Sequence, residues 1–569
     1  MMKKTKASSL KLAVAASMIV LPSSFIATQT AQAAINLPDV GFASHASNYL
    51  IAREAAREKD YATAALFYSR AYEENSSDQV LLERAFVLNV TTGEIARAVE
   101  LAEQIIIARP DHQLARFVLG LNAAKQGKFA AARNHFTKAA PNRIGNLTSA
   151  VLIGWTWAGE NQRKKAYEAL DKLDDQGNLA KFKAAQKAYI ADYLGDSKQA
   201  ARSFKAALTR AGNSLRLIEG YGNFLWRNGQ KDEARKVFAN YLKLTERNPI
   251  IIQRLADLEA GKPAPAKIAK AQQGMFEVLF SLAGALSGRK SSNVALIYAR
   301  LSLFMRPDLP VADVLLAEVY ESINQYGKAV EAFSKIKETS PLYSNVTIQI
   351  ANNLDNMGKS DEAIARLDAL IAREPDNFQA WSTKGSILYG EEKWKEAAQA
   401  LSLALARVKV KQRRHWAVYY YRGMSYERSG QWSRAEADFQ MALKLRPAQP
   451  SVLNYLGYSW IDRGENLDEA LEMVEQAAEL RPRDGYIIDS VGWANYRLGN
   501  YEEAVKRLER AVKLRPGDPT INDHLGDAYW KVGRKLEAGF QWAHARDSKP
   551  DKKMLSKILN KIKNGLDES

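Results

Sequence analysis

The chain of 569 residues has no cysteine and only six histidines. Without cysteine it cannot form disulfides, thiolate metal sites, iron–sulfur clusters or a cysteine nucleophile. Six histidines leave little for a histidine-based metal centre. We therefore expect neither a cofactor nor a metal. The missing thiols suit a protein of an oxidising compartment, where stray thiols would pair wrongly.

Proline is scarce as well: the 17 residues are few for a chain of many short strands and turns. Hydrophobic residues make up 46% and charged residues 25%, as in ordinary globular chains. This composition excludes collagen-like, disordered and multi-span membrane proteins. After residue 33, no stretch is long and apolar enough to predict a membrane span.

The first 33 residues have the pattern of a secretory signal peptide. A basic start is followed by an apolar stretch, residues 12–21, and by Ala31-Gln32-Ala33, a small-x-small sequence that signal peptidase cleaves. The alternative is an uncleaved anchor helix, but the apolar run is short and Pro22 interrupts it. We predict export to the periplasm after cleavage near Ala33. Losing four lysines then lowers the net charge from +17 to +13.

A period of about 34 residues runs through the rest of the chain. It is clearest in three columns near the C-terminal end, which hold proline, alanine and glycine. The columns are Pro447, Pro482, Pro516 and Pro550; Ala435, Ala470, Ala504 and Ala538; and Gly423, Gly457, Gly492 and Gly526. Because three independent columns share one spacing, the chain consists of repeated structural units rather than several unrelated domains.

One unit, which ends at Pro516, carries the whole pattern. It places small, aromatic and apolar residues in a fixed order: Gly492, Gly499, Tyr501, Ala504, Leu508, Ala511 and Pro516. This order resembles the tetratricopeptide repeat, a helix-turn-helix unit. The resemblance covers nearly the whole sequence after the signal. It implies an all-α fold, a right-handed superhelical α-solenoid of about fourteen units.

The same unit reads well as two packed helices. Small residues at Gly492 and Ala504 let the two helix axes approach closely. Gly499 allows the positive φ that ends the first helix. Apolar residues recur at i, i+4 and i+7 from Ala504 and so share one helix face. Pro516 disfavours helical geometry at the residue before it and closes the second helix.

One segment interrupts the repeats. Residues 259–274 contain two prolines, a glycine and several small residues, which are typical of a linker or hinge. The chain then divides into an N-terminal array of about six units, residues 34–258, and a C-terminal array of about eight, residues 275–550. The alternative, one continuous superhelix with a longer loop, stays open. Residues 551–569 predict a capping helix and tail whose lysines, Lys561 among them, face water.

No catalytic signature emerges from the sequence. It has no HExxH motif, phosphate-binding loop or GxSxG motif, and Gly220-Tyr221-Gly222 falls within a helix of the repeats. Acidic pairs such as Glu502-Glu503 are typical of solvated helix faces. Because the repeats leave no segment for a catalytic domain, we predict that the protein is not an enzyme and has no catalytic residues.

The remaining functional feature is a surface. In tetratricopeptide proteins the first helices of the units line a concave groove, and the resemblance assigns five places of each unit to it. In the last four units these places hold residue types that are common in binding hot spots: Tyr420, Arg428, Asn454, Tyr458, Trp493, Tyr496, Arg497, Trp530 and Lys531. We expect a protein partner in this groove. The alternative is that several aromatics pack between neighbouring units.

A basic run forms a second surface feature. Its members are Lys409, Lys411, Arg413 and Arg414, which tyrosines follow in the sequence. Basic residues among aromatics can bind nucleic acid, an anionic glycan or a membrane surface. The alternative is a solvated basic loop. Export argues against nucleic acid, so we expect no nucleic-acid partner and at most peripheral membrane contact.

Together these features predict a protein-interaction scaffold, or adaptor, of the bacterial cell envelope. By analogy with exported tetratricopeptide scaffolds, it would belong to a secretion or envelope-assembly complex. The alternative hypothesis is direct binding of an anionic envelope polymer, an acidic exopolysaccharide or peptidoglycan. The net charge of +13 after export favours this alternative.

Overall fold

The computed structural model describes residues 45–139, 143–173, 177–211, 214–245, 248–288 and 291–566. These residues form 30 α-helices and one short 3-10 helix, without a β-strand. The all-α solenoid expected from the repeats is therefore confirmed. Within the same ranges, no helix has the length and apolar character needed to cross a membrane. The signal peptide expected at residues 1–33 lies outside the described residues.

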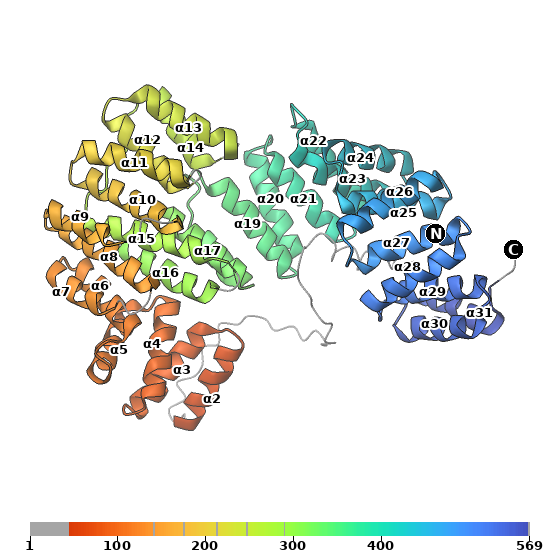
Figure 1. Cartoon of the computed structure of the whole chain (residues 1–569), viewed down its shortest axis with the longest axis horizontal. Helices are drawn as coiled ribbons and strands as arrows, with labels where there is room; N and C mark the ends of the chain where they lie inside the picture. The colour runs from red at the N-terminus through yellow and green to blue at the C-terminus, as the bar shows by residue number, and fades with distance from the viewer. Residues whose placement is uncertain are drawn as a thin grey trace. The chain divides into compact units, whose positions relative to one another are not determined.

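The helices fall into two compact units, and residues 45–359 form the N-terminal one (Figure 1). Neighbouring helices along the chain pack on each other as hairpins. The helices of this unit are α2 (His45–Arg57), α3 (Tyr61–Glu74), α4 (Gln79–Thr92), α5 (Ile95–Ala108), α6 (Gln113–Lys125), α7 (Phe129–Lys138), α8 (Arg143–Gly159), α9 (Arg163–Asp171), α10 (Gly177–Tyr193), α11 (Ser197–Ala211), α12 (Leu215–Arg227), α13 (Lys231–Thr245), α14 (Pro249–Glu259), α15 (Ala271–Leu286), α16 (Ser292–Met305), α17 (Pro310–Ser322), α18 (Tyr326–Phe333) and α19 (Tyr343–Asn356).

Residues 360–566 form the C-terminal unit. It begins with α20, continues as regular hairpins and ends in a single helix, α31. Its helices are α20 (Ser360–Arg373), α21 (Phe378–Gly390), α22 (Trp394–Ala406), η1 (Arg413–His415), α23 (Trp416–Arg428), α24 (Trp432–Leu445), α25 (Pro450–Arg463), α26 (Leu467–Leu480), α27 (Gly485–Arg497), α28 (Tyr501–Leu514), α29 (Pro519–Lys531), α30 (Lys535–Asp547) and α31 (Lys552–Asn564).

The glycine column marks the crossing point of each hairpin. A Cβ atom built on Gly492 would stand 2.6 Å from Leu508 Cγ on the paired helix, and one on Gly526 would stand 2.4 Å from the Trp542 ring. Any larger residue would therefore push the paired helices apart. Gly499 has φ +83° and ends α27 as the repeat pattern predicts.

Helices α15 and α16 lie along the inner face of the N-terminal unit. α15 packs on α8 and α10, and α16 packs on α4 and α6 (Figure 1). All four are first helices of their hairpins, so they belong to the groove-lining face of the superhelix. A Cβ atom on Gly274 of α15 would stand 2.2 Å from the Trp155 ring of α8, which shows how closely the two helices approach.

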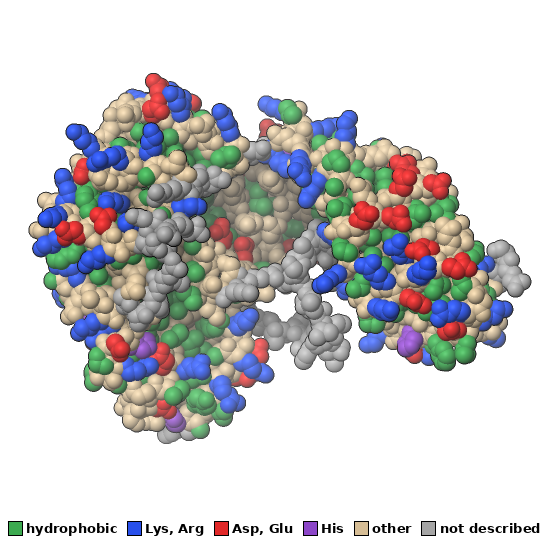
Figure 2. Space-filling model, in the orientation of Figure 1, with side chains coloured by type: hydrophobic (Ala, Val, Ile, Leu, Met, Phe, Trp, Pro, Cys, Tyr) green, Lys and Arg blue, Asp and Glu red, His purple; other side chains and the backbone are tan. Residues whose placement is uncertain are grey.

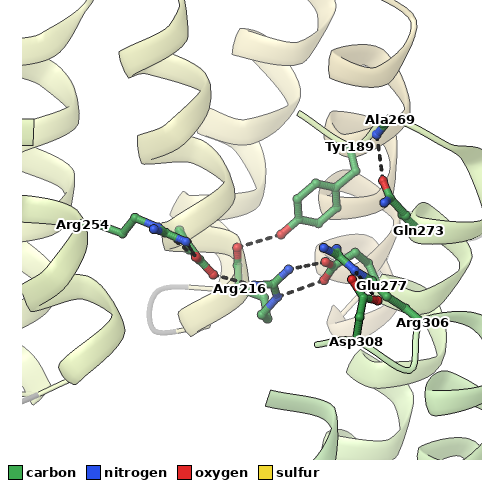
Figure 3. A network of polar contacts seen from close by, with 9 residues as sticks. Tyr189, Arg216, Arg254, Ala269, Gln273, Glu277, Arg306 and Asp308 are labelled. Carbon is green, nitrogen blue, oxygen red and sulfur yellow. Dashed lines mark hydrogen bonds and ion pairs between the residues drawn. The ribbon is translucent and has the colours of Figure 1, made fainter. Parts of the chain in front are cut away.

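A network of polar contacts holds α15 in this position (Figure 3). The Arg216 guanidinium of α12 pairs with the buried Glu277 carboxylate of α15 and with Glu219. Arg254 of α14 also donates to Glu219, at 2.9 Å. Burial lowers the pKa of Arg216, but the two carboxylates raise it by more, so the guanidinium stays charged. Removing one partner of such a buried ion pair would leave an uncompensated charge, which is strongly destabilising.

The boundary between the two compact units falls between Lys359 and Ser360, not in the segment 259–274. That segment lies within the N-terminal unit and is tied to it by hydrogen bonds. Arg227 donates to the Pro265 carbonyl at 3.0 Å, and Lys267 donates to the Tyr193 carbonyl at 3.2 Å. The segment 259–274 therefore runs across α10 and α12 and connects α14 to α15 on the groove face.

Candidate partner-binding groove

The first helices of the C-terminal unit enclose a cavity of about 520 Å³. Most of its wall comes from α23, α25, α27 and α29. Four of the predicted groove residues line it: Tyr420, Arg428, Asn454 and Tyr458. Tyr420 and Asn454 are one repeat apart, so they occupy the same place on successive first helices.

Tyrosines form the aromatic part of the cavity wall. The ring of buried Tyr420 meets that of Tyr455 edge to face, with 5.9 Å between the centroids. The Tyr455 hydroxyl donates to Glu427 Oε2 at 3.0 Å. Burial raises the pKa of Tyr420, Tyr455 and Tyr458 well above the ordinary value. All three hydroxyls therefore stay protonated.

Two polar atoms of the cavity wall are buried without a hydrogen bond to any described residue: Arg428 Nε and Asn454 Oδ1. The Arg428 side chain is only 8% exposed, and its Nε lies 3.5 Å from Glu427 Oε2. One atom is a donor and the other an acceptor. Both atoms are buried within the wall, and the Arg428 guanidinium lies beside the Glu427 carboxylate, so neither atom is itself exposed to the cavity.

The other five predicted groove residues lie outside the cavity wall: Trp493, Tyr496, Arg497, Trp530 and Lys531. Trp493 stacks on Tyr496 and on His524, with centroid distances of 4.7 and 4.0 Å. This stack packs α27 on α29, as the alternative interpretation of the aromatics predicted. Arg497 is exposed and donates to the Asp462 carbonyl at 3.3 Å.

His524 lies at the centre of a buried charged cluster. Its Nδ1 is 2.9 Å from Asp489 Oδ1, and both side chains are more than nine-tenths buried. Burial lowers the pKa of His524, but the carboxylates of Asp489, Asp523 and Asp527 outweigh this effect and raise it above the ordinary value. The pair joins the first helices of two successive units.

The cap helix α31 covers the groove places of the last unit. Lys561 Nζ donates to Asp523 Oδ1 at 2.8 Å and to Asp527 Oδ2 at 2.7 Å, and its side chain is only 16% exposed. The prediction that Lys561 faces water is therefore wrong: two carboxylates of α29 pull it into the groove. Gly565 lies against the Trp530 ring, while Lys531 stays exposed.

Sequence reasoning missed Arg481, which also lines the cavity. It stands at the end of α26 and belongs to neither a first helix nor a place that the family assigns to the groove. A signal was present in the sequence: Leu-Arg-Pro recurs at the ends of the units, at Arg446, Arg481 and Arg515.

The basic run forms an exposed loop between α22 and α23, away from the cavity wall. Lys409, Lys411, Arg413 and Arg414 are all exposed. Lys411 Nζ lies 5.7 Å from the centroid of the Tyr419 ring. Lys409, Lys411 and Arg413 form no ion pair with a described residue. Elsewhere on the visible face of the C-terminal unit, Lys and Arg side chains alternate with Asp and Glu (Figure 2).

The N-terminal unit has a cavity of about 750 Å³ at its first hairpins, lined by residues of α2, α3, α4 and α5 and by Arg109. The carboxylate in its wall, Glu83, already has partners in His112 and Arg109. The hydrogen bonds from these two groups lower the pKa of Glu83 to about 2. Among the described residues, no group of three or more His, Asp and Glu side chains is placed to hold a metal ion.

Family models described as tetratricopeptide or TPR repeats match residues 88–146, 184–249, 348–409, 416–449 and 492–533. The chain is a tetratricopeptide repeat protein. It is similar to the TPR repeat-containing protein PA4667 of Pseudomonas aeruginosa, with 32% identity over 143 residues. That match covers 25% of this chain and 24% of PA4667, so it spans about a quarter of the relative's length.

Solved tetratricopeptide structures resemble the chain in fold alone. The Cut9–Hcn1 hetero-tetramer structure of the APC/C matches 92% of this chain and 97% of its own, with 15% identity and a TM-score of 0.39. YrrB, described as a TPR protein with an unusual peptide-binding site, matches 33% of this chain and 94% of its own, with 23% identity and a TM-score of 0.29. The repeats support a protein-interaction scaffold, the kind of structure that tetratricopeptide repeats build and that is typically non-catalytic.

Proposed function

We propose that the protein is an exported scaffold of the bacterial cell envelope that holds a protein partner in its C-terminal groove, within a secretion or envelope-assembly complex. The cavity wall carries this proposal, because Arg428 and Asn454 line it together with several tyrosines. Tyrosine and arginine are residue types that dominate binding hot spots.

The contrast with the N-terminal unit supports the choice of groove. There the chain's own α15 and α16 lie on the first helices α4, α6, α8 and α10. A partner would have to displace this packed hairpin and its buried Arg216–Glu277 pair. In the C-terminal unit, α31 covers only the last groove places, which leaves the cavity between α23 and α29 accessible.

Export rests on different observations. Residues 1–33 combine lysines, an apolar stretch and the cleavage sequence that ends at Ala33. The complete absence of cysteine suits an oxidising compartment. The similar protein PA4667 also comes from a bacterium.

The groove is tested by the double variant Asn454→Ala/Tyr458→Ala of the full chain. Crosslinking in its own envelope, followed by affinity capture and mass spectrometry, identifies the partner of the wild type. We expect capture to fall about tenfold or more in the double variant, since hot-spot truncation costs more than about 1 kcal/mol. Glu502→Ala, at an exposed position of α28, is the matched control and should capture normally.

Equal capture by the double variant and the control would contradict the groove assignment, provided both proteins melt like the wild type. Charge reversal at Arg428 is unsuitable for this test. Its nearly buried guanidinium lies beside Glu427, so an introduced carboxylate would destabilise the fold by itself.

A second candidate function is binding of an anionic envelope polymer through the loop of Lys409, Lys411, Arg413 and Arg414. The observation that favours it is the exposure of all four cations. The dependence of binding on ionic strength distinguishes the two functions. Binding through exposed charges should weaken steeply as ionic strength rises, whereas binding in the tyrosine-lined groove should change little.

A further inference from the structure

Arginine–aromatic pairs recur along the C-terminal unit. In three hairpins an arginine at the end of the second helix lies over an aromatic ring near the start of the first helix. The guanidinium-to-centroid distances are 5.1 Å for Arg407 and Trp381, 5.1 Å for Arg446 and Trp416, and 5.0 Å for Arg515 and Tyr486. Each contact is a cation–π interaction that joins the two ends of a hairpin.

The hairpin of α25 and α26 lacks this ring. Its arginine is Arg481, which stands before a proline just as Arg446 and Arg515 do. Ser451 occupies the place that corresponds to Tyr486, 35 residues earlier in the sequence. As a result, no aromatic ring of the described chain lies over the Arg481 guanidinium.

The position of Ser451, where the aromatic ring is missing, opens into the cavity. Arg481 and Ser451 both belong to the wall of the cavity of about 520 Å³, together with the rings of Tyr420 and Tyr458. The ion pair between Arg481 Nη1 and Asp484 Oδ2 is loose, at 3.8 Å, and the Arg481 side chain is 33% exposed. The guanidinium therefore keeps a face free for contact with a bound group.

We propose that the partner supplies the missing ring: one of its Phe, Tyr or Trp side chains enters the cavity above Ser451 and stacks on Arg481. The inference rests on the proposed function and adds the class of side chain that the groove recognises. The Arg515–Tyr486 pair of the next hairpin is its intramolecular counterpart. The tyrosines of the wall favour the same occupant, because aromatic rings pack well against each other edge to face.

Three small probes test the chemistry directly on the full chain: N-acetylphenylalanine amide, N-acetylleucine amide and N-acetylglutamate amide. Ligand-observed NMR at millimolar concentrations measures the binding of each. The aromatic amide should bind about fivefold or more tightly than the leucine amide. Equal binding of the two, or preferential binding of the glutamate amide, would overturn the proposal and would point to a nonspecific apolar or an anion site instead.

Two variants test whether the aromatic amide binds at Arg481. Ser451→Tyr supplies Arg481 with a ring from the chain itself, and Arg481→Gln removes the cation. Both should reduce binding of the aromatic amide about fivefold or more, while Arg515→Gln, whose arginine already has its ring, should leave it unchanged. A loss in all three variants, or in none, would overturn the proposal. If Ser451→Tyr melts early, Arg481→Gln decides the outcome alone.

Capture of the natural partner by the same variants distinguishes failure of this inference from failure of the proposed function. Capture that survives Ser451→Tyr and Arg481→Gln but is lost in Asn454→Ala/Tyr458→Ala would leave the groove as the binding site and reject the aromatic residue. Capture that survives all of these variants would reject both.

Discussion

At the scale of single residues, His524 shows how the repeat uses one position for packing rather than for binding. Its ring stacks on Trp493, and its Nδ1 lies 2.9 Å from Asp489. The charged groups that face it come from α27 and α29, and Lys561 of α31 partly balances them. Trp493, a predicted groove residue, is thus used to hold two successive units together.

The raised pKa of His524 makes the stability of the C-terminal unit depend on pH. The folded chain holds the proton more tightly than the unfolded chain does. The stabilisation is therefore complete below the ordinary pKa of about 6.5 and is lost as pH rises through the higher folded-state pKa. We expect the free energy of unfolding to decrease over this range in urea titrations followed by circular dichroism.

His524→Gln should remove this part of the pH dependence and cost about 1–3 kcal/mol at low pH, because it leaves buried Asp489 without its charged partner. His544→Gln, at an exposed position of α30, is the matched control and should retain the wild-type pH dependence. If the unfolding free energy of His524→Gln depends on pH as strongly as that of the wild type, the assignment of the pKa shift to this pair is contradicted.

The sequence predicts the role of a residue where the repeat pattern dictates it, but not where contacts with a neighbouring helix decide it. The crossing glycines and the positive φ of Gly499 follow from the pattern alone. The aromatic stack of Trp493 does not, because an aromatic at a groove place can face the groove or the next unit. Lys561 was misplaced for the same reason: its partners, Asp523 and Asp527, lie on another helix.

At the scale of elements, α15 departs most from a simple repeat array. The helices from α2 to α14 follow one another along the chain as stacked repeats. Helix α15 does not continue this stack but packs back on α8 and α10. The contacts that place it join residues far apart in the chain: Glu277 pairs with Arg216, and Gln272 donates to the Ala124 carbonyl at 2.9 Å. No local pattern encodes such contacts, so the period of the sequence predicts the helix but not its position.

Gly274→Ala tests the docking of α15. The added Cβ would stand 2.2 Å from the Trp155 ring, so we expect overpacking that costs about 1–3 kcal/mol of unfolding free energy. Hydrogen exchange of α15 should also become faster. Gly284→Ala is the control in the same helix, with open space around its Cβ, and should be neutral or stabilising by up to about 1 kcal/mol. Equal stability of the two variants would contradict the close contact with α8.

At the scale of the whole molecule, the two compact units differ in what their inner faces offer. The N-terminal unit presents its groove-lining helices to its own α15 and α16. The C-terminal unit keeps a cavity whose wall contains several tyrosines and an arginine without a ring. The number and order of the helices follow from the repeat period. The boundary at Lys359 does not, because it reflects where long-range packing ends rather than where prolines gather.

Export is a prediction for the whole molecule. The mature protein should begin at Ala34 and carry a net charge of +13. N-terminal sequencing of the protein purified from the periplasm of its own cells checks this. Recovery of the chain in the cytoplasm with residues 1–33 intact would contradict it.

The central claim is that a protein partner binds in the C-terminal groove and not on the outer surface of the repeats. The most direct measurement places a photo-crosslinking amino acid at Arg463, an exposed residue of the cavity wall, and, in a second protein, at the exposed outer position Lys506. Irradiation of intact cells should give a defined protein adduct from position 463 and none from position 506. Adducts of equal yield from both positions, or an adduct from position 506 alone, would contradict the account.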